Sequence, residues 1–143
     1  MKFSEKLKNF KDCHDAIEWV GDKTLKEAWA TCERADWMLW LSAKMIGKPG
    51  WSTHREIVLV GCWISRRAQK YWADKKDTRP MDAIKAVEQW VKIPTEENKN
   101  AAGAAGAAAW VTGAATGAAR AAGDAEHKIM CEYIRKTLKI GRV

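Results

Sequence analysis

Three histidines and four cysteines are the side chains of this 143-residue chain that are able to carry nucleophilic or metal chemistry. Cys13 and His14 are adjacent, and Cys32 is the next thiol along the chain. A zinc site needs four ligands, usually at short spacing, and no such cluster is present. His54 falls at an exposed helix start and His127 on the polar side of the last predicted helix, and neither has a recognisable partner. We therefore predict no enzyme activity, no metal and no cofactor.

Glu27, Arg34 and Asp36 form a second polar group, surrounded in the sequence by large apolar residues. Charged groups that become buried are usually paired, so we expect an ion-pair network that fixes the packing of helices. The alternative is a polar patch that contacts a partner. The two carboxylates do not make an acid–base pair without a cleft to hold a substrate.

A third group is a run of basic and aromatic side chains in the middle of the chain. Its members are Arg66, Arg67, Lys70, Tyr71, Trp72, Lys75, Lys76 and Arg79. Residues 41–79 carry nine basic and three acidic side chains, so the surplus behind the net charge of +7 is concentrated here. Such a run is a solvated helix face, a nucleic-acid surface with Tyr71 or Trp72 stacking on bases, or a surface for an acidic protein.

The elements that position these groups are all predicted to be helices, and the most unusual of them is rich in Ala and Gly. It runs over residues 101–123 after a cap at Thr95, whose side chain can accept from the first turn. Residues spaced alternately by three and four form one seam along it: Gly103, Gly106, Trp110, Gly113, Gly117, Arg120 and Asp124. Because the chain has nine Trp, we expect Trp-rich helices in 1–94 to pack onto this thin helix in 95–143.

The other helices are predicted from their start and stop signals. A first helix is capped by Ser4, and Gly21 ends a second one. Two capping boxes follow, Thr24 to Glu27 and Thr53 to Glu56. The second box opens a helix whose residues 57–64 are apolar on every side, which predicts burial all round.

Further signals define the rest of the chain. Gly47 to Gly50 breaks the helix of 35–45, Pro80 fits the first turn of another, and the Ala/Gly-rich helix continues or bends near Gly123 into a closing helix. No alternating strand pattern appears. The prediction is one compact all-α domain, residues 1–143, with six or seven helices around the long Ala/Gly-rich C-terminal helix.

The cysteines and the first residues bear on the compartment. The four Cys are widely spaced among apolar neighbours, as expected of buried free thiols in a reducing compartment. The start MKFSEKLKNFKDC has no apolar run long enough for a signal peptide, and Ala and Gly are too weakly apolar to make 101–119 a membrane span. We predict a cytoplasmic protein without membrane contact, and a homodimer if the Ala/Gly face is not filled by indoles.

A resemblance covers most of the chain and is most specific in residues 16–41, the signature segment. Its matched residues are Trp19, Gly21, Asp22, Glu27, Trp29, Cys32, Arg34, Asp36, Trp37 and Trp40. Later matches follow in order at Gly61-Cys62, Arg79-Pro80, Glu88-x-Trp90 and the Thr95-Glu-Glu start of the Ala-rich repeat. The pattern resembles the Imm-5-like family of immunity protein domains, found in bacteria and in phage genomes.

The resemblance implies a class of action without catalytic residues. Proteins of that family are thought to neutralise a toxin, so we expect a non-enzymatic inhibitor that occludes the active or substrate-binding surface of a protein. The target would be a bacterial toxin or, for a phage-borne gene, a host-defence effector, and it could itself be a nuclease. Two alternatives stay open: nucleic-acid binding through residues 66–79, and capture of a small anionic nucleotide in the Gly seam near Arg120.

Overall fold

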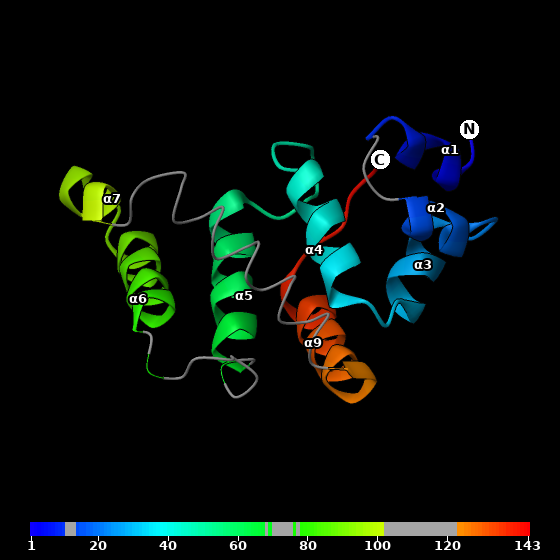
Figure 1. Ribbon diagram of the computed structural model, residues 1–143. Helices are drawn as coiled ribbons and strands as arrows, with labels where there is room; N and C mark the ends of the chain where they lie inside the picture. Colours follow the sequence, from blue (N-terminus) through cyan, green and yellow to red (C-terminus); the bar gives the residue numbers. More distant parts are fainter. Residues whose placement is uncertain (11–13, 68, 70–75, 77, 102–122) are drawn as a thin grey trace.

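The structure is a computed structural model that describes residues 1–10, 14–67, 69, 76, 78–101 and 123–143. All the regular structure within these ranges is helical. The helices are α1 (Phe3–Lys8), α2 (His14–Val20), α3 (Leu25–Thr31), α4 (Ala35–Lys44), α5 (His54–Arg67), α6 (Arg79–Lys92), α7 (Glu96–Ala101) and α9 (Gly123–Thr137). Figure 1 shows α6 and α7 at one end, α5 in the middle, and α1, α2 and α3 at the other end beyond α4 and α9. The predicted all-α single domain is confirmed.

Local signals in the sequence set most helix ends. Thr24 donates to the Glu27 carboxylate from its backbone N (2.8 Å) and its hydroxyl (3.0 Å), and the Glu27 backbone N donates back to Thr24 Oγ1 (3.2 Å). Thr53 and Glu56 make the same three bonds at 3.0, 3.1 and 3.2 Å. Gly21 follows α2 with φ of 51°, a left-handed conformation that favours Gly. Both predicted capping boxes and this helix stop are therefore confirmed.

One helix end differs from the prediction, and another decides between two predicted alternatives. Ser4 does not cap α1, which begins at Phe3; instead the Glu5 carboxylate accepts from the backbone N of Lys2 at 3.1 Å. Gly123 has φ of 80°, outside the right-handed helical region, and α9 begins there, so of the two predicted alternatives the closing helix that starts near Gly123 is confirmed. The described ranges consequently hold eight helices, not six or seven.

Helix α5 lies between two apolar clusters, which explains why its sequence is apolar on nearly every side. Ile57, Val60 and Ile64 belong to the main core with residues of α1, α3, α4 and α9. Val58 and Cys62 instead belong to a second cluster with Ile84, Val87 and Val91 of α6. Burial all round is wrong at one position, because Leu59 is 42% exposed.

The sequence predicts that Trp-rich helices pack around the Ala/Gly-rich helix. Most of that helix, residues 102–122, lies outside the described ranges. Its start is described: Thr95 Oγ1 accepts from the backbone N of Asn98 at 3.1 Å, so the predicted cap at Thr95 is confirmed. Elsewhere the indoles contact other rings. Trp63 stacks on Tyr133 with centroids 3.8 Å apart, and Trp29 meets Trp51 edge-on at 6.4 Å.

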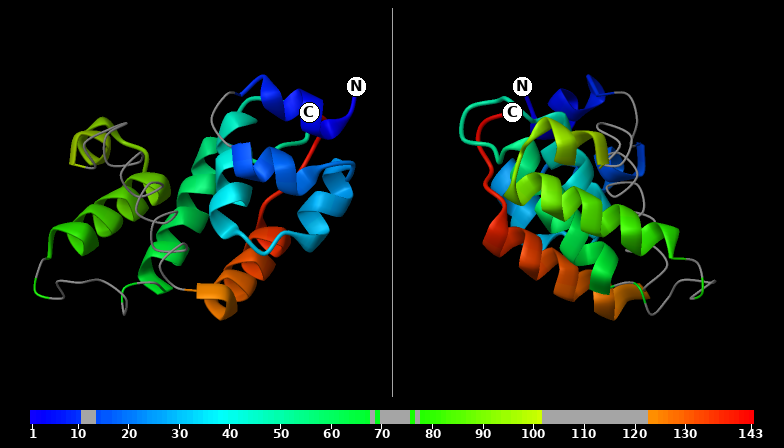
Figure 2. Two further views of the ribbon diagram at one scale, coloured as in Figure 1. Left: turned by 45° about the vertical axis from the view of Figure 1, so that its right-hand side comes forward. Right: turned by 90° about the vertical axis from the view of Figure 1, so that its left-hand side faces the viewer.

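The two chain ends lie side by side, next to α1 (Figures 1 and 2). Lys6 Nζ donates to the main-chain oxygen of Val143 at 3.0 Å. Trp51 Nε1 donates to the Arg142 carbonyl at 2.8 Å, and the Lys139 backbone N donates to Ser52 Oγ at 2.7 Å. These bonds hold the segment after α9 against the rest of the molecule. Among the described helices, none combines the length and apolar character that crossing a membrane requires.

Candidate functional site

Two indoles of the signature segment each carry a cation on their ring. Lys23 Nζ lies 4.6 Å from the centroid of Trp19, and Arg34 Cζ lies 4.4 Å from that of Trp37. The two rings are 5.8 Å apart and both side chains are half-buried. Lys23 Nζ also donates to the Trp19 carbonyl at 2.8 Å. We call Trp19, Lys23, Arg34 and Trp37 the cation–indole cluster; the ring quadrupoles attract the two charges.

The Asp36 carboxylate holds the Arg34 side chain of this cluster in place. Asp36 is 4% exposed and accepts two parallel bonds from Arg34, Nε to Oδ1 at 2.9 Å and Nη2 to Oδ2 at 2.6 Å. Such a bidentate pair fixes the plane of the guanidinium group. The predicted pairing of Arg34 and Asp36 is confirmed. The predicted place of Glu27 in this ion-pair network is wrong. Glu27 is exposed and accepts two bonds from Thr24, which lower the pKa of its carboxyl, so it acts as a helix cap.

Helix α9 supports the segment that joins α3 to α4. Arg135 Nη1 donates to the carbonyls of Trp29 (3.2 Å) and Cys32 (2.9 Å) at the end of α3. The backbone N of Ala35, at the start of α4, donates to His127 Nδ1 at 3.2 Å. These three bonds satisfy groups that helix ends leave without an intrahelical partner. The polar position predicted for His127 is wrong: its side chain is 4% exposed, because it reaches from α9 to α4.

The described thiols are poor nucleophiles. Cys32, Cys62 and Cys131 are buried and free, as predicted. Burial raises the pKa of Cys62 and of Cys131 to about 12, and it raises the pKa of Cys32 as well. All three are therefore protonated at neutral pH. Cys13 lies outside the described ranges, and within them no three His, Cys, Asp or Glu side chains are grouped to hold a metal ion.

An apolar cavity of about 40 Å³ lies under the signature segment. Its lining includes Phe3 and Leu7 of α1, Trp19 of α2, Leu25 of α3 and Trp40 of α4. Cavities that accept benzene are nearer 150 Å³. This one is therefore a gap between packed side chains, too small for a ligand of that size.

The structure describes only part of the predicted basic run. Arg66 Nε donates to Glu88 Oε1 of α6 at 3.0 Å, and this hydrogen bond raises the pKa of Arg66. Arg67 Nε donates to Glu126 Oε2 of α9 at 2.8 Å, and its Cζ lies 5.8 Å from the centroid of Trp63. These two arginines join α5 to its neighbouring helices. Lys76 is exposed, Arg79 begins α6, and the remaining members, Lys70, Tyr71, Trp72 and Lys75, lie outside the described ranges.

The other predicted residues of the signature are mostly structural. Trp29 and Cys32 belong to the main core, and Trp40 packs against it, with Phe10 edge-on at 6.0 Å. Asp22 is exposed and pairs with Lys2 at 2.6 Å. Sequence reasoning missed Lys23, whose side chain lies over the Trp19 ring. The signal that the sequence offers is weak: a cation four residues after a Trp in the last turn of a short helix.

Comparisons with known proteins identify a family for this chain but no activity for that family. Residues 52–132 match a family model described as a family of unknown function (DUF6931). The match begins just before α5 and ends within α9, so it does not include the signature segment. No curated protein and no solved structure matches the chain.

Proposed function

The chain belongs to the family of unknown function DUF6931, and we propose that it is a non-enzymatic inhibitory protein of the immunity-protein kind. It binds a protein target, a bacterial toxin or a host-defence effector, and covers the target's active or substrate-binding surface. The contact surface is the face formed by α1, α2, α3 and the start of α4, which carries the cation–indole cluster. The proposal places the protein in the cytoplasm, where such targets act.

The cation–indole cluster is the observation that carries this proposal. Trp and Arg are the residues most enriched where binding energy concentrates in protein interfaces. Here Trp19 and Trp37 are half-buried, so they are held rigidly and still present part of their rings. The Asp36 carboxylate and the bonds from α9 fix the same segment, which lowers the entropy lost on binding.

The cluster suits a protein better than a nucleic acid. Stacking on bases needs an accessible aromatic face, whereas Lys23 and Arg34 already lie over Trp19 and Trp37. In the basic run, Arg66 and Arg67 are paired with carboxylates. Nucleic-acid binding through the remaining members of that run stays a prediction, as does nucleotide capture near Arg120.

The test compares charge reversals at two neighbouring lysines, the half-buried Lys23 and the exposed Lys26. Lys23→Glu changes the cluster, and Lys26→Glu makes the same charge change on the outer side of α3. Each protein is immobilised and exposed to lysate of the host in whose genome the gene lies. We expect wild type and Lys26→Glu to retain a specific protein that Lys23→Glu retains at least about tenfold less.

The captured protein is then purified and its activity is titrated with the chain. We expect the captured protein to lose its activity fully when the chain is present at a stoichiometric ratio, and Lys23→Glu to inhibit it more weakly. A captured protein whose activity is unchanged, or equal capture by all three forms, would contradict the proposal.

A further inference from the structure

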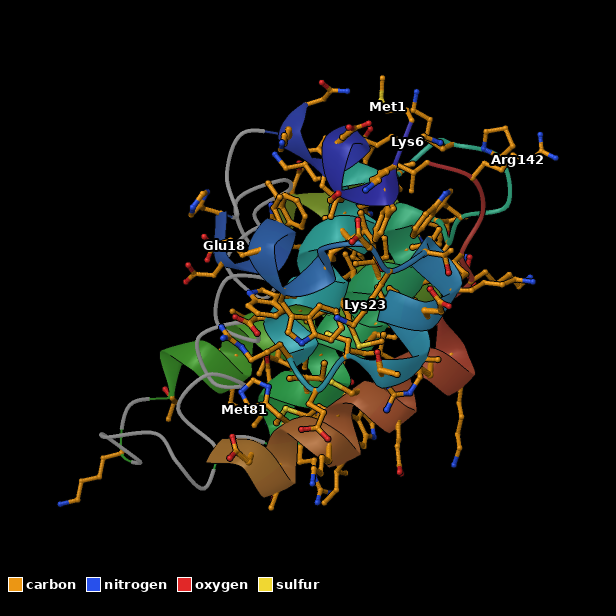
Figure 3. The ribbon with its side chains drawn as sticks, turned by 90° about the vertical axis from the view of Figure 1, so that its right-hand side faces the viewer. Met1, Lys6, Glu18, Lys23, Met81 and Arg142 are labelled. Atoms are coloured by element: carbon orange, nitrogen blue, oxygen red, sulfur yellow. The ribbon has the colours of Figure 1, made fainter. Side chains whose placement is uncertain are left out.

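A groove of about 490 Å³ lies where the two ends of the chain meet α3. It is lined by residues of three segments: Met1, Lys2, Phe3 and Lys6; Asp22, Lys23, Thr24 and Leu25; and Gly141, Arg142 and Val143. Figure 3 shows Met1, Lys6 and Arg142 at the upper end of this face and Lys23 below them. We call it the terminal groove. Its volume is in the range of ligand-binding clefts.

Cationic side chains dominate the terminal groove. Four cationic side chains and one carboxylate line it, a net side-chain charge of +3. The carboxylate of Asp22 pairs with Lys2, at a distance of 2.6 Å. Lys23 contacts the Trp19 carbonyl, which offsets its charge less than a carboxylate would, whereas Lys6 contacts a main-chain oxygen of the terminal residue Val143. The groove therefore keeps a net positive side-chain charge, which attracts an anionic partner.

The lining is also partly apolar, which restricts the class of molecule that fits the groove. Met1, Phe3 and Leu25 contribute apolar surface between the cationic groups. Phe3 is the single aromatic residue of the lining and is half-buried, so the groove offers little for a base to stack on. A peptide segment that carries both carboxylates and apolar side chains matches this mixture better than a nucleic acid.

The terminal groove continues into the surface already proposed as the contact face. Phe3 and Leu25 line both the groove and the apolar cavity under the signature segment. Lys23 lines the groove and lies over Trp19 of the cation–indole cluster. One bound segment is thus able to contact the groove and the cluster together.

Resting on the proposed function, we infer that the terminal groove binds an acidic segment of the target, in which carboxylates alternate with apolar side chains. Lys6, Lys23 and Arg142 contact the carboxylates, and Phe3 and Leu25 receive the apolar side chains. Binding is steered by charge, so it weakens as salt rises from about 0.01 M to about 0.1 M and the Debye length falls from about 30 Å to about 10 Å.

The experiment uses a short fluorescein-labelled peptide in which Glu and Leu alternate, and measures its affinity for the full chain by fluorescence anisotropy. A peptide with Gln in place of Glu and a single-stranded DNA of equal charge are the competing probes. We expect Lys6→Glu/Arg142→Glu to bind the acidic peptide at least about tenfold more weakly than wild type. Lys85→Glu, on exposed α6 at the far end of the molecule, should bind as wild type does (Figure 1).

Lys6→Gln/Arg142→Gln is the control for a folding effect, because it removes the charges without adding repulsion. An intermediate loss of affinity for the acidic peptide, at an unchanged melting temperature, supports the inference. Equal affinity for the Gln peptide, tighter binding of the DNA, or no loss in either groove variant overturns it. The proposed function is judged separately. If Lys6→Glu/Arg142→Glu still captures and inhibits the target, the groove inference fails and the inhibitory function stands.

Discussion

Removing the Arg135 side chain tests whether α9 holds the connection between α3 and α4. Its Nη1 donates to the Cys32 carbonyl at 2.9 Å and to the Trp29 carbonyl at 3.2 Å. A hydrogen bond from a charged donor contributes about 1.5–3 kcal/mol to stability. The longer of the two bonds shares the same donor nitrogen, so the pair is worth little more than one good bond.

Arg135→Met keeps an unbranched side chain and removes both bonds. Because Arg135 is half-buried, water replaces part of the lost bonding, and we expect the free energy of unfolding to fall by about 2 kcal/mol. For a domain of this size the melting temperature should fall by about 6 °C. The matched control is Lys136→Met, which removes the same charge from the exposed neighbouring residue and should change the free energy by less than about 0.5 kcal/mol.

Urea unfolding followed by indole fluorescence and by far-ultraviolet circular dichroism measures the difference, and coincident transitions support a two-state comparison. If Arg135→Met proves as stable as Lys136→Met, the two bonds contribute nothing and our view of α9 as the support of this segment is refuted.

Other predictions concern acid stability, thiols and close packing. The pKa of Glu27 is lowered from 4.5 by its bonds to Thr24, so its contribution to stability is present above pH 4.5 and is lost as the pH falls through the lowered value; Glu27→Gln should flatten that acid loss in denaturation curves. In a Cys13→Ser background, the three buried thiols should react with a disulfide reagent at pH about 8 only when urea unfolds the chain, since two of them have pKa values of about 12; fast reaction in native buffer would contradict their burial. Gly141→Ala should destabilise the chain by about 1–3 kcal/mol in thermal melts, because a Cβ there would overlap the Pro49 carbonyl; Gly141→Ala as stable as wild type would show that the contact yields easily.

Local features of the fold were predictable from the sequence because their partners are a few residues apart. Thr24 with Glu27 and Thr53 with Glu56 form capping boxes whose partners are three positions apart, and Gly21 ends a helix through its own backbone freedom. The apolar stretch in α5 also carried correct information. Its lack of a polar side reflects two clusters on opposite sides, with only Leu59 left exposed.

Contacts between distant segments were not predictable. The bond from Ala35 to His127 joins residues 92 positions apart, and nothing next to His127 in the sequence marks it as buried. Arg67 looked like part of a basic surface because its partner Glu126 lies 59 positions away. The terminal groove likewise brings together residues 1–6 and 141–143, a juxtaposition that only the packing of α1 against the last segment creates.

Hydrogen–deuterium exchange of the chain, alone and bound to its captured target, shows directly which face of the protein contacts the target. We predict that binding slows exchange in residues 2–6, 19–37 and 139–143, which form the face of α1, α2, α3 and the start of α4 together with the terminal groove. Slower exchange confined to α6, with that face unchanged, would contradict it.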